Sequence, residues 1–267
     1  MIAKSRLLFR DGRFNSKKYN LFTMRFLFRK EIQGFFSSLT GYLVIAVFLA
    51  VTGLCLWVFP GALNIPESGY ASLESLFYIA PWVFLFLVPA ITMRSFAEEI
   101  KTGTIELLLT KPVSEGQLTA AKFLAAVALV FIALLPCVVY IISVWRLGNP
   151  PGNLDTGATW GAMMGLMLLG AVYAAIGIFA SSLTDHQVIA FMAAAVTCFA
   201  FCEGFDALAK LIPSAAVQDM VSWLGIWEHY ASISRGVVDV RDLIYFFGVM
   251  LCFLLLTRLK LQSRKWK

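Results

Sequence analysis

The side chains that could do chemistry are few in this sequence, and their spacing predicts no catalytic or metal centre. The two histidines, His186 and His229, lie far apart, and neither has further ligands at metal-binding spacing. Asp185 next to His186 is typical of a solvated turn. Cys198 and Cys202 share an apolar run, where packing is favoured over a metal site. Because no phosphate-binding, metalloprotease or nucleophile-elbow motif occurs either, we expect no enzyme activity, cofactor or metal on this chain.

One charged segment, residues 93–117, has instead the spacing of a binding surface. It reads MRSFAEEIKTGTIELLLTKPVSEGQ and has long apolar runs on both sides. Stretches that begin at Ser95 and Ser114 match the capping-box pattern at a helix start. Gly103 favours a helix end, and Pro112 disfavours helix at the residue before it. The segment is therefore predicted to form a helix, a turn, a short helix, a second turn and the start of a long helix.

The short helix that follows Gly103 would be capped by Thr104 and would carry Leu107, Leu108 and Leu109. Burying three leucines contributes on the order of 5 kcal/mol, which makes them a possible docking knob for another protein. They could equally rest on the chain's own helices or on lipid headgroups. The residues alone leave these alternatives open.

The composition identifies the class of protein that positions this segment. Of the 267 residues, 60% are hydrophobic and only 14% are charged, whereas about a quarter are charged in an ordinary soluble domain. Several stretches are long enough to cross a bilayer, which takes roughly 20 apolar residues. We predict an all-α integral membrane protein with six transmembrane helices. Their expected bounds are Gly41–Phe59, Leu76–Met93, Leu118–Trp145, Thr159–Ser182, Val188–Cys202 and Leu243–Thr257.

The basic residues predict the orientation of these spans. Nine precede the first span, four lie in or just past the second loop and five form the C-terminal tail, so 18 (9 + 4 + 5) of the 22 lie on one side. Because Lys and Arg are concentrated in cytoplasmic loops, both termini and residues 94–117 are predicted to be cytoplasmic. The same distribution explains the net charge of +6 without a nucleic-acid partner.

The segments outside the spans divide into three parts. Residues 1–24 form a basic extension that is either flexible or absent, since translation could also start at Met24. Residues 25–39 have apolar side chains at helical spacing on one face, which predicts an interfacial amphipathic helix. Residues 203–241 form a long outer loop with short interfacial helices, broken at Pro213 and Gly225. The domain assignment is therefore a single transmembrane domain over residues 25–267.

Two further features concern packing and energy supply. Gly161, Gly165 and Gly170 lie in the fourth predicted span, and glycines at such spacing let helices approach closely, either within the chain or in a homodimer. Ionisable residues occur only near the ends of the predicted spans, whereas ion-coupled carriers bury them inside. A transporter with this sequence would therefore take its energy from a partner.

The charged segment resembles the signature of ABC-2 type ABC transporter permeases. The resemblance rests on Glu98-Glu99, Gly103-Thr104-Ile105-Glu106-Leu107-Leu108, Lys111-Pro112-Val113 and Lys122, and it covers essentially the whole chain from Met24. It implies a permease subunit that couples to a separate ATPase subunit. The implied contact residues are Glu98, Glu99, Thr104, Glu106, Leu107, Leu108 and Pro112.

Three longer stretches resemble the gliding-motility-associated permeases of the GldF type. They read GYLVIAVFLAVTGLCLWVF, APWVFLFLVPAITMRSF and ISRGVVDVRDLIYF. The resemblance implies a multi-pass protein of the bacterial cytoplasmic (inner) membrane that exports a substrate and pairs with an identical or related second permease chain. The alternative is a membrane scaffold that recruits a cytoplasmic partner and transports nothing. Neither the loops nor the span faces indicate a substrate.

Overall fold

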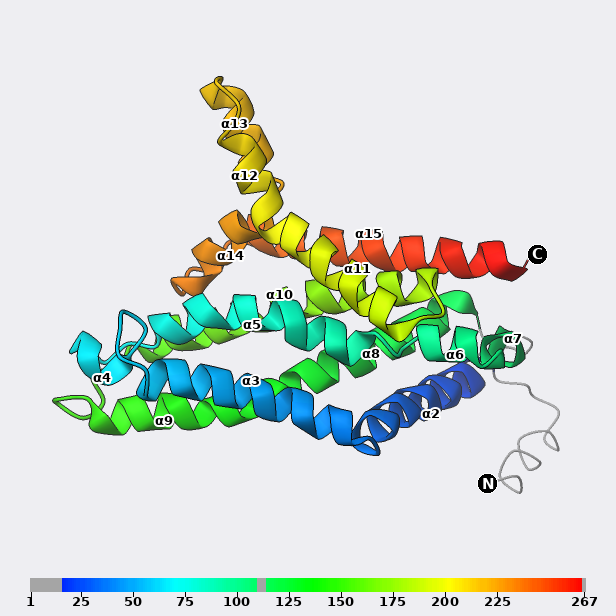
Figure 1. Ribbon diagram of the computed structural model, residues 1–267, viewed down its shortest axis with the longest axis horizontal. Coiled ribbons are helices and arrows are strands. Elements are labelled where there is room, and N and C mark those ends of the chain that lie inside the picture. The colour runs from blue at the N-terminus through cyan, green and yellow to red at the C-terminus, as the bar shows by residue number, and fades with distance from the viewer. Residues whose placement is uncertain (1–15, 110–113, 266–267) are drawn as a thin grey trace.

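The computed structural model describes the backbone of residues 16–109 and 114–265. All the secondary-structure elements in these residues are helices (Figure 1). Six of its helical stretches are long and apolar enough to cross a membrane, which confirms the all-α fold and the number of spans. These stretches are Leu39–Trp57 (α3), Glu74–Lys101 (α5 and α6), Glu115–Leu147 (α8 and α9), Thr156–Leu183 (α10), Gln187–Ala209 (α11 and α12) and Val240–Arg264 (within α15).

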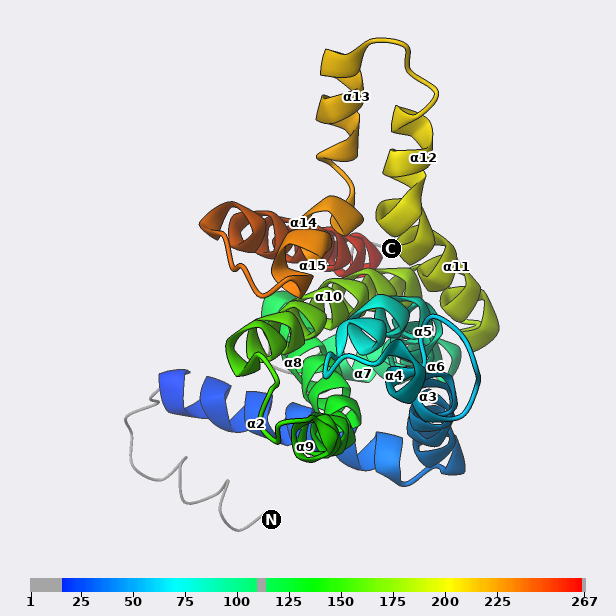
Figure 2. The same ribbon diagram turned by 90° about the vertical axis from the view of Figure 1, so that its left-hand side faces the viewer.

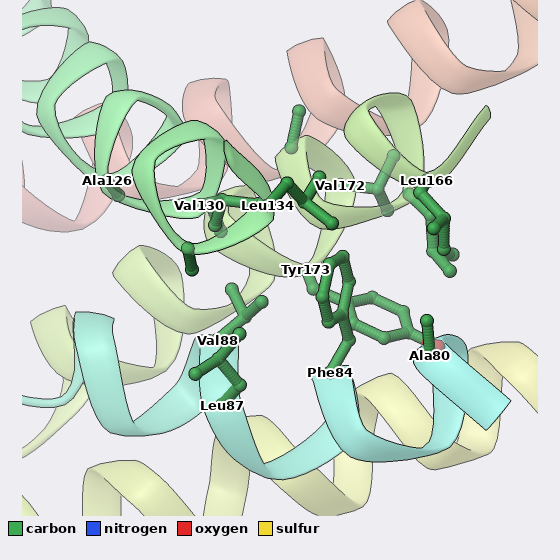
Figure 3. Packing of buried hydrophobic residues seen from close by; sticks show 14 of the residues in the cluster. Ala80, Phe84, Leu87, Val88, Ala126, Val130, Leu134, Leu166, Val172 and Tyr173 are labelled. Carbon is green, nitrogen blue, oxygen red and sulfur yellow. The ribbon is translucent and has the colours of Figure 1, made fainter. Parts of the chain in front are cut away.

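The fourth span, α10, is the centre of the bundle. It packs against α5 (Glu74–Thr92), α8 (Glu115–Leu134), α11 (Gln187–Phe199) and α15 (Val240–Lys265), as the view along the bundle in Figure 2 shows. In the most apolar 18-residue stretch of α10, 72% of the residues are buried, whereas 22% are buried in the corresponding stretch of α3. Side chains from α5, α8 and α10, among them Phe84, Val130 and Tyr173, meet in the core (Figure 3). The peripheral spans leave their apolar faces for lipid.

The third span is interrupted near its middle. Helix α8 ends at Leu134, a 3₁₀ turn covers Leu135–Cys137, and α9 continues over Val138–Leu147. Pro136 lies in this turn. Proline has no N–H to donate and its ring clashes with the preceding helical turn, so it interrupts the α-helix. Pro136 therefore breaks the span predicted over residues 118–145 without ending it.

The fifth span extends further than expected. After α11, a π-helical turn over Ala200–Gly204 leads directly into α12 (Phe205–Ala209), so the first part of the predicted outer loop 203–241 continues the helix. Two short helices follow, α13 (Ala215–Ser222) and α14 (Ile226–Ser234). The expected breaks are present, since Pro213 lies between α12 and α13, and Gly225 is the N-cap of α14.

Helices α12 and α13 form an antiparallel hairpin that projects sideways from the bundle in both views (Figures 1 and 2). We call Phe205–Ser222 the arm. Helix α13 packs mainly on α12 and buries none of its residues. Apolar side chains on the arm are exposed, with Leu211 at 78% and Met220 at 73%.

The helix before the first span, α2, covers Ser16–Phe36 and thus begins before Met24, within the predicted extension 1–24 and ahead of the expected start at residue 25. Residues 1–15 lie outside the described part of the chain. In Figure 2, α2 runs across the bundle rather than along it. It packs on α8, and Leu27 is buried in this contact region.

Two more short helices complete the fold. Helix α4 covers Ile65–Ser68, and α7 covers Thr104–Leu109. Helix α7 and α6 (Ala97–Lys101) lie at the same end of the bundle as the C-terminal end of α15 (Figure 1). We call this the basic end.

Candidate functional site

The chain turns from α5 into α6 at the basic end, and a distant serine completes this turn. The backbone N–H groups of Phe96 and Ala97 donate to Ser181 Oγ of α10 at 2.9 and 3.0 Å. The same hydroxyl donates to the carbonyl of Met93 at 3.1 Å. A side-chain oxygen that accepts from the first amides of a helix acts as its N-cap. Ser181 thereby attaches α6 to the centre of the bundle.

The predicted capping role of Ser95 is wrong. Its N–H still donates to the carbonyl of Thr92 in the preceding turn, and α6 begins two residues later with no cap from its own N-cap residue, Phe96. The helix start moved because Ser181 satisfies the free amides from another helix. Sequence patterns cannot identify such a cap, since the two partners are 85 residues apart.

Two local signals beside α7, the glycine before it and the capping box after it, have the expected outcome. Gly103 has a φ of 70°, a left-handed conformation that glycine adopts without strain at a helix end. Ser114 and Gln117 form the full capping box of α8: Gln117 N–H donates to Ser114 Oγ at 3.3 Å, and Ser114 N–H donates to Gln117 Oε1 at 3.2 Å. These devices need only neighbours in sequence, and the sequence therefore predicts them.

A buried lysine, Lys122 of α8, is the centre of a charged site at the basic end. It is 2% exposed, and its Nζ lies 2.8 Å from Glu31 Oε1 of α2 and 3.0 Å from Glu99 Oε2 of α6. It also donates to the carbonyl of Ser95 and lies 4.9 Å from the centre of the Phe96 ring. Three acceptors and a ring face thus compensate for the loss of water around the ammonium group.

A second lysine, Lys30 of α2, completes the group. Its Nζ donates to Glu99 Oε1 at 3.0 Å, so both oxygens of this carboxylate have a lysine partner. Partial burial by itself would lower the pKa of Lys30. The Glu99 carboxylate, with smaller contributions from Glu31 and Glu98, raises this pKa, and the net pKa lies above its ordinary value. We call Lys30, Glu31, Glu99 and Lys122 the charge cluster.

The charge cluster joins three helices that are distant in sequence. Lys30 and Glu31 belong to α2, Glu99 to α6 and Lys122 to α8. From the sequence, Lys30 is only one of the charges that set orientation, Lys122 is also part of the family resemblance, and Glu31 has no predicted role. No local pattern links residues that are 69 or 91 positions apart. The one available signal was a lysine inside an otherwise apolar run, at Lys122.

The predicted contact residues of the segment divide by burial. Glu98, Thr104 and Glu106 are exposed at the basic end. Glu99 is 8% exposed and engaged within the chain, so it differs from the surface position expected of it. For Leu107 and Leu108 the structure describes the helical backbone of α7 but not the side chains, and Pro112 lies outside the described residues.

The three glycines of α10 all face segments of the same chain. A Cβ at Gly161 would lie 3.0 Å from Gly236 Cα, and one at Gly165 would lie 2.7 Å from Ile233 Cγ2. At Gly170 it would lie 2.6 Å from Val130 Cγ1. These close approaches use the glycines for packing inside the bundle.

The end of the bundle opposite the basic end carries a smaller polar site. His229 Nδ1 lies 2.7 Å from Asp242 Oδ1, its Nε2 lies 3.0 Å from the carbonyl oxygen of Trp223, and its ring stacks on Tyr245 with centres 3.9 Å apart. The pair joins α14 to the first turn of α15. Within residues 16–109 and 114–265, no three His, Cys, Asp or Glu side chains gather in a way that could hold a metal ion.

The comparisons with known proteins agree with this architecture. The family model of the ABC-2 family transporter proteins matches residues 33–257, which is most of the chain and includes α6, α7 and all six spans except the last part of α15. A search of curated proteins gives no match. Members of this family are the membrane permease components of ABC transporters. The chain therefore belongs to the ABC-2 family of transporter proteins.

Proposed function

We propose that this chain is the permease subunit of an ATP-driven exporter of the bacterial cytoplasmic membrane, associated with gliding motility. A separate ATPase subunit would dock at the basic end, which would be cytoplasmic, and an identical or related permease chain would complete the transport pathway. Membership of the ABC-2 family supports the permease role. The association with motility rests on the resemblance of three stretches to permeases of the GldF type.

The observation that carries the coupling part of the proposal is the contrast between two adjacent glutamates. Glu98 is exposed and available to a partner, whereas Glu99 is held in the charge cluster. A surface for docking and a firm attachment to the bundle thus lie side by side on the five residues of α6. Glu106 and Thr104 on α7 extend the exposed surface.

The attachment gives the coupling a physical route. ATP binding would close the ATPase pair and displace α6 and α7. Ser181 links α6 to α10, and Glu99 links it to Lys30 of α2 and Lys122 of α8. Because a charge left unpaired in a buried site is costly, these helices would follow α6 rather than separate from it. Movement of α2, α8 and α10 would then change access to a pathway between the two permeases.

Affinity purification of the tagged protein from mild-detergent membranes, with mass spectrometry of the partners, tests the proposal. We expect a stoichiometric ATPase with the wild type and its loss from Glu98→Lys/Glu106→Lys, which inverts two exposed charges at the basic end. Asp219→Lys, an exposed carboxylate on the arm, is the matched control and should retain the ATPase. Absence of an ATPase from the wild type, or equal recovery from all three proteins, would contradict the docking site.

A further inference from the structure

A cavity of about 490 Å³ lies next to the charge cluster at the basic end. It is lined by α2, α3, the end of α5, α6, the start of α7 and α8, near the point where α2 joins the first span. Cavities of this size hold small organic ligands. Its charged lining residues are Lys30, Glu31, Arg94, Glu98, Glu99 and Lys122.

The cavity changes in polarity along its length. The charged and hydroxyl groups lie near the end of the spans. They come from α2, α6 and the turns beside them, from the first residues of α3 and α7, and from Lys122 of α8. The opposite wall is apolar, because it is made by side chains further into the spans. These are Val44 of α3, Ala90 and Ile91 of α5, and Ala125, Ala126 and Leu129 of α8. A ligand that fits this lining is itself polar at one end and apolar at the other.

Arg94 is the charged group in this lining that needs a partner. Its Nε is buried, and among the described residues neither a hydrogen-bond acceptor nor a carboxylate within 4.0 Å serves it. Glu99 has both oxygens on lysines, and one oxygen of Glu31 is on Lys122. Glu98 is exposed and makes no ion pair with Arg94 in the described part of the chain. Burying an unpaired guanidinium nitrogen is costly, so the site favours an anion.

We infer that the cavity binds an anionic phospholipid of the adjacent leaflet. Its phosphate would lie against the Arg94 guanidinium, whose planar donors match phosphate oxygens in pairs. Its acyl chain would follow Val44, Ile91 and Leu129 toward the middle of the bilayer. The lining has three cations and three carboxylates, so the preference for an acidic headgroup rests on Arg94 and not on a net positive charge. The inference goes beyond the proposed function, because lipid binding needs no ATPase.

Gly34 offers a way to close the cavity without disturbing the fold. It lines the cavity from α2, and a Cβ built there would meet no atom within 4 Å. A leucine at this position is therefore expected to fill space that a lipid would occupy, and leucine favours helix more than glycine does. Gly248 of α15 also has open space around it but does not line the cavity, which makes Gly248→Leu the matched control.

The test is native mass spectrometry of the purified protein after exchange into micelles with phosphatidylglycerol, phosphatidylcholine or inorganic phosphate. We expect retention of phosphatidylglycerol over phosphatidylcholine by the wild type. Arg94→Gln should weaken the binding of phosphatidylglycerol about tenfold, as the loss of one charge-assisted hydrogen bond implies. Gly34→Leu should do the same. Arg29→Gln, which removes an exposed charge from α2 outside the cavity, and Gly248→Leu should leave retention unchanged.

Three results would overturn the inference. Equal retention of the two lipids by the wild type would show that the site does not select an anion. Displacement of the lipid by inorganic phosphate alone would show that the acyl chain contributes nothing and that the cavity binds a free ion. Loss of the ATPase from Arg94→Gln without a change in lipid retention would assign Arg94 to the protein partner. None of these results bears on Glu98 and Glu106, so the docking proposal is tested separately.

Discussion

At the basic end, ion pairs with α2 and α8 and a cap from α10 fix the five residues of α6, whereas α13 on the arm buries none of its residues. The two regions have helices of similar length but opposite surroundings. A helix with few buried contacts opens or moves at low cost, and one with buried charged contacts does not. The basic end is thus firmly attached to the bundle, as the proposed transmission of a displacement requires, whereas α13 on the arm packs mainly on α12.

The largest effect is expected from removing the centre of the charge cluster. Lys122→Met keeps much of the side-chain volume but leaves Glu31 and one oxygen of Glu99 without their lysine. We expect a loss of about 3 kcal/mol in the free energy of unfolding, as for other buried pairs broken from one side. Denaturant titration in detergent measures it. Lys101→Met, an exposed lysine of α6, is the control, and equal losses in the two variants would show that the cluster does not hold the basic end.

A smaller effect is expected where α10 meets α5. A Cβ at Gly177 would lie 2.0 Å from Thr92 Oγ1 and 2.9 Å from Thr92 Cβ, which is too close for any side chain. Gly177→Ala should therefore force the helices apart and cost about 2 kcal/mol, in the range of overpacked cores. The same titration should show no loss for Gly248→Ala, which has room. An unaffected Gly177→Ala protein would mean that α5 and α10 adjust freely.

The cap from α10 should contribute less than either. Ser181→Ala leaves the amides of Phe96 and Ala97 without an acceptor and should cost about 1 kcal/mol, as cap removals do. Hydrogen exchange of these two amides should accelerate. Ser182→Ala is the matched control, because the Ser182 hydroxyl donates to the carbonyl of Phe179 in its own helix. Faster exchange in both variants would show general loosening and not loss of a cap.

The smallest effect is expected on the arm. Met220 is 73% exposed, so Met220→Ser should change the free energy of unfolding by less than about 0.5 kcal/mol in detergent, as surface substitutions do. A loss comparable to that of Ser181→Ala would mean that the arm is held as firmly as the basic end. The comparison between the two regions would then fail.

The features that could be predicted from the sequence are those with local causes. The six spans follow from apolar runs, the capping box from Ser114 and Gln117, and the helix end from Gly103. Pro213 and Gly225 likewise marked real breaks. Each of these needs only the residue itself or neighbours a few positions away.

The features that could not be predicted depend on contacts between distant segments. Ser181 replaced Ser95 as the cap of α6 because the fold brings α10 to this turn. Glu99 was expected on the surface because it lies in a charged, loop-like stretch, yet two lysines from other helices bury it. The sequence indicates the partly exposed Arg94 only as a loop charge, since its cavity exists only once six helices have packed.

The central claim is that the basic end receives the ATPase, and photo-crosslinking in intact cells tests it most directly. A photoreactive amino acid placed at Glu98, at Glu106 and, for comparison, at Met220 would capture whatever lies against each exposed position. We expect a crosslinked ATPase subunit from Glu98 and Glu106 and none from Met220. An ATPase captured from Met220, or from no position while the chain is folded in the membrane, would contradict it.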